Sequence, residues 1–273
     1  MSTFQNNLEQ IRNDYAGIFS ALDRASKELK VKFVLIGAQC RDVWTRHIEQ
    51  QRRLTRDVDY AVRIENTTTW KYLRDFLIES EGMEWSSSEP YRFRIHGQVL
   101  DIIPFDGVND EFVFDSTGLV LSVSGMNLIT THSIVKVGGC DVVTVAGLCV
   151  LKLISYSEKP DQRSKDYDDF LFLLQNYGKI RGAEIFEYQD FTQLFEEKQD
   201  FDDVAATILG REIRAALNND TKLINTILTS LEMKLGGYSI DELESIVFEE
   251  SLPKDRKKMA EFRLLLQVIN ELR

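Results

Sequence analysis

The chain has little of the chemistry that marks several common protein classes. Its 273 residues include only three cysteines, three histidines and four prolines. The cysteines are Cys40, Cys140 and Cys149. Their number is odd and their spacing fits no metal motif, so we interpret them as buried apolar groups in a reducing cytoplasm. The histidines are scattered along the chain, which argues against a zinc site.

Long apolar runs are also missing. No segment approaches the ~20 apolar residues of a membrane-spanning helix. The N-terminal residues show neither the basic nor the apolar region of a signal peptide. We therefore expect a cytoplasmic protein that does not contact a membrane.

Positive charge is scarce relative to negative charge. The formal net charge is −11, with 43% hydrophobic and 28% charged residues, and the isoelectric point is near 4.9. Such a composition is ordinary for a globular protein but argues against a broad basic surface for nucleic-acid backbones. Any phosphate-binding site must therefore gather its positive charge locally.

Periodicity divides the chain near residue 145. Before that point, helical spacing over 4–29 alternates with apolar and alternating runs that predict strands and a hairpin. After it, the pattern is almost wholly helical. We predict two domains, an α/β domain over 1–145 and a helical domain over 146–273.

The most informative stretch is the alternating run over residues 53–62. Asp57 and Asp59 stand two residues apart, so a strand would point both carboxylates to one face and the apolar residues to the other. Two acids so placed can share one or two divalent ions, which offset their repulsion. The alternative is that the pair lies at a solvated strand edge or caps a helix.

Asp101 is a third acid in an apolar setting. It lies within a run over 99–103 that we predict to be the second strand of a hairpin with residues 91–95. A charge there is costly unless it is paired or metal-bound. It either joins Asp57 and Asp59 or forms an ion pair with a nearby arginine, for which Arg92 and Arg94 are the candidates.

Two further features suit phosphate chemistry. Gly37 follows the apolar strand over 33–36 and begins a predicted helix, where backbone N–H groups and the helix dipole favour an anion. In the helical half, Lys152 precedes a run of mixed charge over 163–171. That run either lines a site or forms an ion-paired helix face.

These residues together resemble the AbiEii/AbiGii-type nucleotidyltransferases of the DNA polymerase β-like superfamily, to which the MenT toxins are related. The resemblance covers roughly residues 30–175, and residues 176–273 carry no motif of that family. The motifs are Gly37-Ala38, Arg53-x-Thr55-x-Asp57-x-Asp59, Asp101, Lys152, and Arg163-x-Lys165-Asp166-x-x-Asp169.

The resemblance implies an α+β fold, in which a small mixed sheet flanked by helices is followed by a helical C-terminal domain. It also implies transfer of a nucleoside monophosphate from an NTP to a hydroxyl group, with Mg²⁺ or Mn²⁺ as cofactor. Asp57, Asp59 and Asp101 would bind the metal, and Asp101 would activate the acceptor.

The remaining motif residues would act on the nucleotide or with it. Gly37, Ala38 and Gln39 would contact the triphosphate, and Lys152 would neutralise phosphate charge. The others that the resemblance assigns to the site are Arg53, Thr55, Arg163, Lys165, Asp166 and Asp169. Arg53 either serves the nucleotide or pairs with an acid of the triad.

One position departs from the superfamily, where serine often follows the glycine and Ala38 stands here. Three functions stay open. The first is a toxin-like enzyme acting on tRNA, protein or a small molecule, with a cognate antitoxin as partner. The second is an aminoglycoside-type nucleotidyltransferase, which suits the acidic balance. The third is a nucleotide-binding module without turnover.

Overall fold

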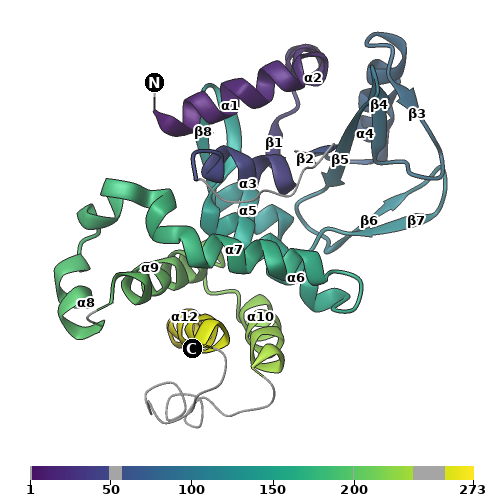
Figure 1. Ribbon diagram of the computed structural model, residues 1–273. Helices are drawn as coiled ribbons and strands as arrows, with labels where there is room; N and C mark the ends of the chain where they lie inside the picture. Colours follow the sequence, from purple (N-terminus) through teal and green to yellow (C-terminus); the bar gives the residue numbers. More distant parts are fainter. Residues whose placement is uncertain (1, 49–56, 199, 236–255) are drawn as a thin grey trace. The chain divides into compact units, whose positions relative to one another are not determined.

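Alternating and β-branched segments of the N-terminal half form a seven-stranded mixed sheet, drawn in Figure 1 of the computed structural model. The strands are β1 Phe33–Ile36, β2 Asp57–Arg63, β3 Glu84–Trp85, β4 Arg92–Ile95, β5 Gln98–Phe105, β8 Ile134–Val137 and β9 Cys140–Val143. Their order is β3-β4-β5-β2-β1-β9-β8. The pairs β2–β5 and β1–β9 are parallel. A separate two-stranded sheet is formed by β6 Glu111–Phe114 and β7 Leu119–Ser122.

Five helices accompany this sheet in the described residues of the N-terminal unit. They are α1 Thr3–Asp14, α2 Ala16–Leu29, α3 Gly37–Thr45, α4 Thr67–Glu79 and α5 Met126–His132. Helix α3 packs against β1 and β2, and α5 packs against β2 and β8. Helix α1 lies on α3, and α2 lies on α4.

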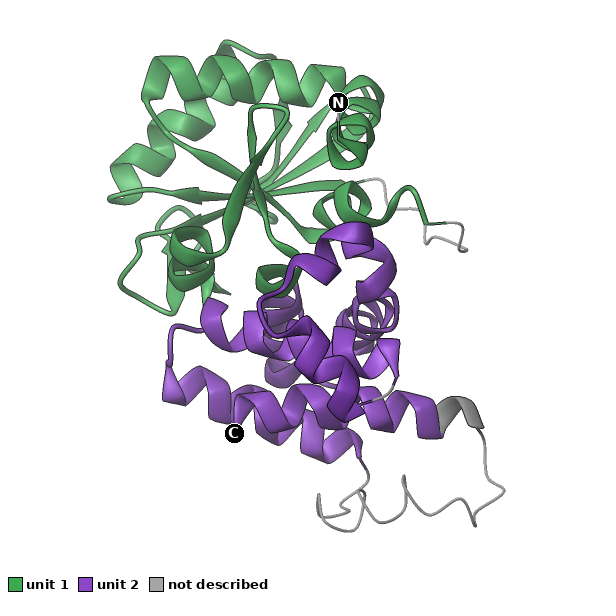
Figure 2. Ribbon diagram, turned by 90° about the vertical axis from the view of Figure 1, so that its left-hand side faces the viewer, with its two compact units in different colours: residues 1–148 green, residues 149–273 purple. Residues whose placement is uncertain are grey.

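The structure describes residues 2–48, 57–198, 200–235 and 256–273. The chain divides into two units, residues 1–148 and 149–273, coloured separately in Figure 2. In the part described, every element from Val145 onward is helical. These elements are α6 Val145–Glu158, α7 Ser164–Arg181, the 3₁₀ helix η1 Gly182–Glu187, α8 Phe191–Lys198, α9 Phe201–Ala216, α10 Thr221–Lys234 and α12 Arg256–Leu272.

Helix α9 is the centre of the second unit. It packs against α7, α8 and α12, and α12 also contacts α10. Residues 203–210 are all buried, so the first half of this helix is enclosed on every side, and Ile213 and Ala216 are buried farther along it. Within the described residues of both units, no helix is both long and apolar enough to cross a lipid bilayer.

The alternation of β2 separates an apolar face from an acidic one. Val58, Tyr60 and Val62 are at most 3% exposed. The ring of Tyr60 makes edge contacts with Phe19 of α2 and with Phe33 of β1. This core fixes which way β2 faces, because a shift of one residue would bury its acids instead. Asp59 is therefore turned away from the Tyr60 core.

Most of the expected elements are confirmed, and one is wrong. The hairpin of β4 and β5 and the strand β1 lie where the sequence predicted them. The continuous helix expected over 4–29 is instead two helices, which meet at Tyr15. Tyr15 leaves the helical conformation (φ −124°, ψ 34°), and its hydroxyl accepts a hydrogen bond from Nε2 of Gln39 at 3.0 Å. The sequence pattern over residues 108–144 predicts mixed strands and loops, and the structure adds helix α5 there.

Candidate active site

The register of four strands places the acidic residues in one row across the sheet. Ile36 of β1 pairs with Asp59 of β2, Asp59 pairs with Asp101 of β5, and Asp101 pairs with Arg92 of β4. Residues that are directly paired on neighbouring strands point to the same face of a sheet. The two acids and Arg92 therefore share one face by virtue of the backbone alone.

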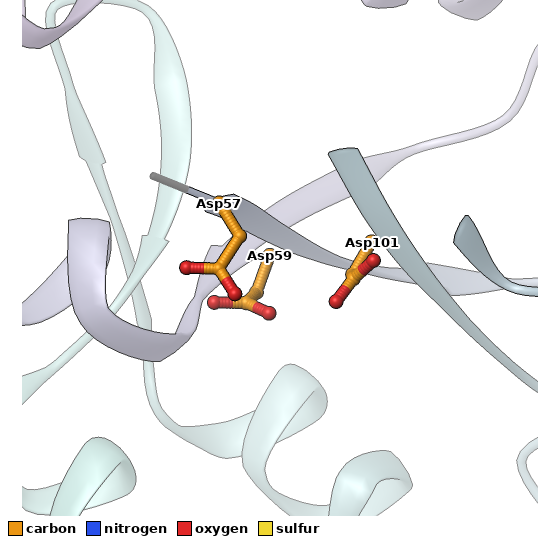
Figure 3. Close-up of side chains that lie close together, drawn as sticks. All are labelled: Asp57, Asp59 and Asp101. Carbon is orange, nitrogen blue, oxygen red and sulfur yellow. The ribbon is translucent and has the colours of Figure 1, made fainter. Parts of the chain in front are cut away.

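Asp57, Asp59 and Asp101 form a compact group of carboxylates. One carboxylate oxygen from each lies within 4.8 Å of the others. Figure 3 shows all three side chains projecting from β2 and β5 toward the same side. Asp101 is buried, and the other two are partly exposed. Carboxylate oxygens converging at this separation are the hard ligands that Mg²⁺ and Mn²⁺ prefer.

Arg92 binds both oxygens of Asp101. Its Nε donates to Oδ1 and its Nη2 donates to Oδ2, each at 2.8 Å. Its Nη1 donates to Oε1 of Glu89 at 2.6 Å. The hydrogen bonds to Asp101 raise the pKa of Arg92 above its ordinary value. Both expectations for Asp101 therefore hold at once, since it pairs with an arginine and also lies beside Asp57 and Asp59.

Gly37 lies directly against Asp59. Its φ is +68°, and a Cβ at this position would lie 2.0 Å from Oδ2 of Asp59. Glycine is required here for two reasons, the left-handed backbone and the carboxylate that occupies the space of a side chain. The turn predicted from sequence thus brings Gly37, the first residue of α3, into contact with Asp59.

Gln39 and Ala38 follow Gly37 in the first turn of α3. Gln39 is buried, with its amide bonded to the hydroxyl of Tyr15. Burial and the nearby charges of Asp14 and Asp57 raise the pKa of Tyr15, which stays protonated at neutral pH. The amide of Gln39 thus has a fixed partner inside the protein.

The second unit holds a separate charged cluster. Nζ of Lys152 on α6 lies 2.7 Å from Oδ1 of Asp166 and 2.9 Å from Oδ2 of Asp169, both on α7. Nη1 of Arg163 lies 3.5 Å from Oδ2 of Asp166. The positive charges of Lys152 and Arg163 therefore offset the negative charges of Asp166 and Asp169 in this cluster.

Burial of Lys152 alone would lower its pKa. The carboxylates of Asp169 and Asp166 outweigh this effect and raise it above the ordinary value. Lys152 is therefore charged at neutral pH, and its two carboxylate partners leave one of its three N–H donors for a further acceptor. Lys165 is exposed on α7.

The predicted site residues thus fall into two clusters, each within its own unit. Gly37, Asp57, Asp59 and Asp101 meet in the first unit, and Lys152, Arg163, Asp166 and Asp169 meet in the second. Arg53 and Thr55 lie outside the described residues.

Two neighbours of the acidic group had no role in the expected site. Arg92 was named only as an alternative partner for Asp101, although the hairpin already implies its position. In a hairpin that turns at residues 96–97, Ile95 faces Gln98. Counting three residues back along β4 and three forward along β5 then pairs Arg92 with Asp101. Tyr15 had no comparable signal, because its contact with Gln39 joins segments that are distant in sequence.

Comparisons with known proteins add little to this geometry. No protein-family model and no curated protein matches the sequence. Among solved structures, the chain is similar to the solution structure of the antibiotic-resistance factor ANT(2'')-Ia, with 13% identity and a TM-score of 0.37. That similarity covers 68% of this chain and 98% of the other. A likeness this weak supports no conclusion about function.

Proposed function

We propose that this protein is a metal-dependent nucleotidyltransferase that moves a nucleoside monophosphate from an NTP to a hydroxyl group. The observation that carries the proposal is the convergence of Asp57, Asp59 and Asp101 to within 4.8 Å beside the glycine turn of α3. Like-charged carboxylates at this distance repel one another, and a divalent cation resolves the repulsion. The sequence motifs that resemble AbiEii-type enzymes support the same assignment.

The donor set fits Mg²⁺ or Mn²⁺, because all three ligands are carboxylate oxygens. Bound there, the metal would supply positive charge that makes an acceptor hydroxyl more acidic and offsets the charge of departing pyrophosphate. The chain's own part is to hold the three carboxylates in place and to orient the triphosphate, since transfers of this kind depend on positioning and charge neutralisation.

We assign phosphate binding to residues 37–39. The first turn of α3 leaves backbone N–H groups without helical partners, and these can donate to phosphate oxygens. The acceptor oxygen then bonds to the α-phosphorus, the bond from that phosphorus to the bridging oxygen breaks, and pyrophosphate leaves. Asp101 is the carboxylate that we propose activates the acceptor, by accepting the proton that its hydroxyl group loses.

The roles of the second cluster rest on the resemblance alone. On that pattern Lys152 neutralises phosphate charge, Asp166 is catalytic, and Arg163 and Lys165 contribute to nucleotide binding. Arg53 and Thr55 belong to the same proposed set. Separate substitutions at Lys152 and Asp166 test these roles independently of Asp57 and Asp59.

A toxin that modifies tRNA or protein, with a cognate antitoxin, is the biological role that the resemblance favours. A cationic small molecule is the second candidate acceptor, because the net charge of −11 attracts cations and repels tRNA. The chain's acidic balance is the specific observation behind that candidate.

The test is to incubate the purified protein with Mg²⁺ and each of the four NTPs, alone, with total tRNA and with a panel of aminoglycosides. Pyrophosphate release and transfer of label are measured in each mixture. We expect transfer that requires metal and is lost in Asp57→Asn and in Asp59→Asn. Asp115→Asn, at an exposed position outside the acidic group, serves as the matched control and should retain activity.

Each outcome separates the candidates. Label on tRNA alone favours the toxin-like enzyme, and label on an aminoglycoside alone favours the small-molecule enzyme. Nucleotide binding with no pyrophosphate release in any mixture favours a module without turnover. Full activity in both Asp variants would contradict the proposed site.

A further inference from the structure

The contact between Arg92 and Asp101 is built by the sheet register. Arg92 and Asp101 are directly paired on β4 and β5, and Asp101 is directly paired with Asp59 on β2. The guanidinium takes both carboxylate oxygens of Asp101 in a fork whose two hydrogen bonds are each 2.8 Å long. A fork of this kind fixes the rotation of a carboxylate as well as its position.

Arg92 is itself anchored. Its Nη1 binds Glu89, and its backbone N–H donates to the carbonyl oxygen of Glu89 at 2.9 Å. Nε1 of Trp85 holds the same turn by donating to the carbonyl oxygen of Pro90 at 3.0 Å. The guanidinium is therefore fixed from its far side.

The repulsion between Asp59 and Asp101 makes a fixed contact to Asp101 necessary. Asp59 and Asp101 are directly opposite each other, and like charges in that relation destabilise a sheet. Asp101 would relieve the repulsion by rotating away from Asp59 if nothing held it. The side chain of Asp101 is 8% exposed, so little water is available to solvate it in another orientation.

We propose that Arg92 is a positioning residue that holds the Asp101 carboxylate toward Asp59, so that the three ligands are assembled before a cation binds. In this role Arg92 acts through Asp101, whose two carboxylate oxygens it binds. The inference rests on the proposed function, because it assigns metal binding to the three carboxylates.

A lysine at this position separates charge from geometry. Arg92→Lys keeps the positive charge but cannot form the two-pronged contact. Loss of a partner that orients a metal ligand typically weakens metal binding by about 10- to 100-fold. We expect Arg92→Lys to weaken Mn²⁺ binding about tenfold, at the lower end of that range.

The experiment is a titration of the full-length protein with Mn²⁺, followed by electron paramagnetic resonance of the free ion, without nucleotide. Arg94→Lys is the matched control, since Arg94 lies two residues along β4, is exposed and faces Val99. Glu89→Gln is a second variant, which weakens the anchor of Arg92 by removing the negative charge at a position 39% exposed and so leaves the core intact. It should weaken Mn²⁺ binding by a smaller factor than Arg92→Lys.

The results distinguish this inference from the function on which it rests. Weaker binding in Arg92→Lys and Glu89→Gln, with wild-type binding in Arg94→Lys, supports the positioning role. Wild-type binding in both Arg92→Lys and Glu89→Gln overturns it, while loss of binding in Asp57→Asn would leave the proposed metal site standing. A wild-type protein that binds no Mn²⁺ contradicts the metal-dependent function itself.

Discussion

Replacing Gly37 by alanine should disable the acidic group through a single methyl group. The new Cβ would lie 2.0 Å from Oδ2 and 2.6 Å from Cγ of Asp59. Ordinary contacts begin near 3.4 Å, so the carboxylate must move by about 1.4 Å or the first turn of α3 must shift by as much. A displacement of about 1 Å in a reacting group can cost about 10²-fold in rate.

The substitution carries a second cost. Gly37 has φ +68°, and a residue with a Cβ in the left-handed region costs about 1–2 kcal/mol. Gly82 provides a matched control, because its φ is +67° and nothing lies within 4 Å of the position of its Cβ. Gly82→Ala therefore has the same unfavourable backbone conformation, but its new Cβ contacts no other atom.

Two assays separate these effects. Urea unfolding should show Gly82→Ala destabilised by about 1–2 kcal/mol and Gly37→Ala destabilised by more. Titration with Mn²⁺ should show wild-type affinity in Gly82→Ala and at least tenfold weaker binding in Gly37→Ala, on the scale of a disturbed ligand shell at about 10- to 100-fold. Wild-type Mn²⁺ affinity in Gly37→Ala would refute the close approach of Gly37 to Asp59.

Two predictions concern the second unit. Lys152→Met should lower the free energy of unfolding by about 3–5 kcal/mol, because it removes the cation that the buried carboxylates of Asp166 and Asp169 share. Urea unfolding should show most of that loss recovered in the triple variant that also carries Asp166→Asn and Asp169→Asn, and no recovery would contradict the explanation. Burial raises the pKa of Asp203 to about 6, despite the neighbouring charge of Arg263. The stability that this group contributes is present below its unfolded pKa near 3.8 and is lost as the pH rises through 6. Asp203→Asn should therefore gain about 1–2 kcal/mol relative to wild type between pH 5 and pH 7.5. A difference in melting temperature that does not change with pH would oppose this.

Local pattern was sufficient for the parts of the site that lie within one strand or one turn. Alternation in β2 predicted that Asp57 and Asp59 share a face, because the Tyr60 side of the strand had to be buried. Glycine after an apolar strand predicted the turn at Gly37, where a positive φ is required. These features depend on neighbours in sequence and on side-chain period alone.

Long-range pairing was beyond such reasoning. That Asp101 lies beside Asp59 depends on the parallel pairing of β5 with β2, across a connection that contains α4, β3 and β4. The partners of Lys152 lie 14 and 17 residues away on another helix, so helical spacing could not reveal them. The contact of Tyr15 with Gln39 on α3 joins segments 24 residues apart, so no local pattern predicted it.

The row from Ile36 through Asp59 and Asp101 to Arg92 makes the candidate site a property of strand alignment. A one-residue insertion at the start of β5, with Gln98 held in place, would turn Asp101 to the opposite face and bring Leu100 opposite Asp59. The same insertion in the His96–Gly97 turn would lengthen a loop and leave the alignment of β5 with β2 unchanged. Changes of chain length can therefore be tolerated at the ends of these strands, whereas inside them a single added residue would break the alignment of Asp59, Asp101 and Arg92.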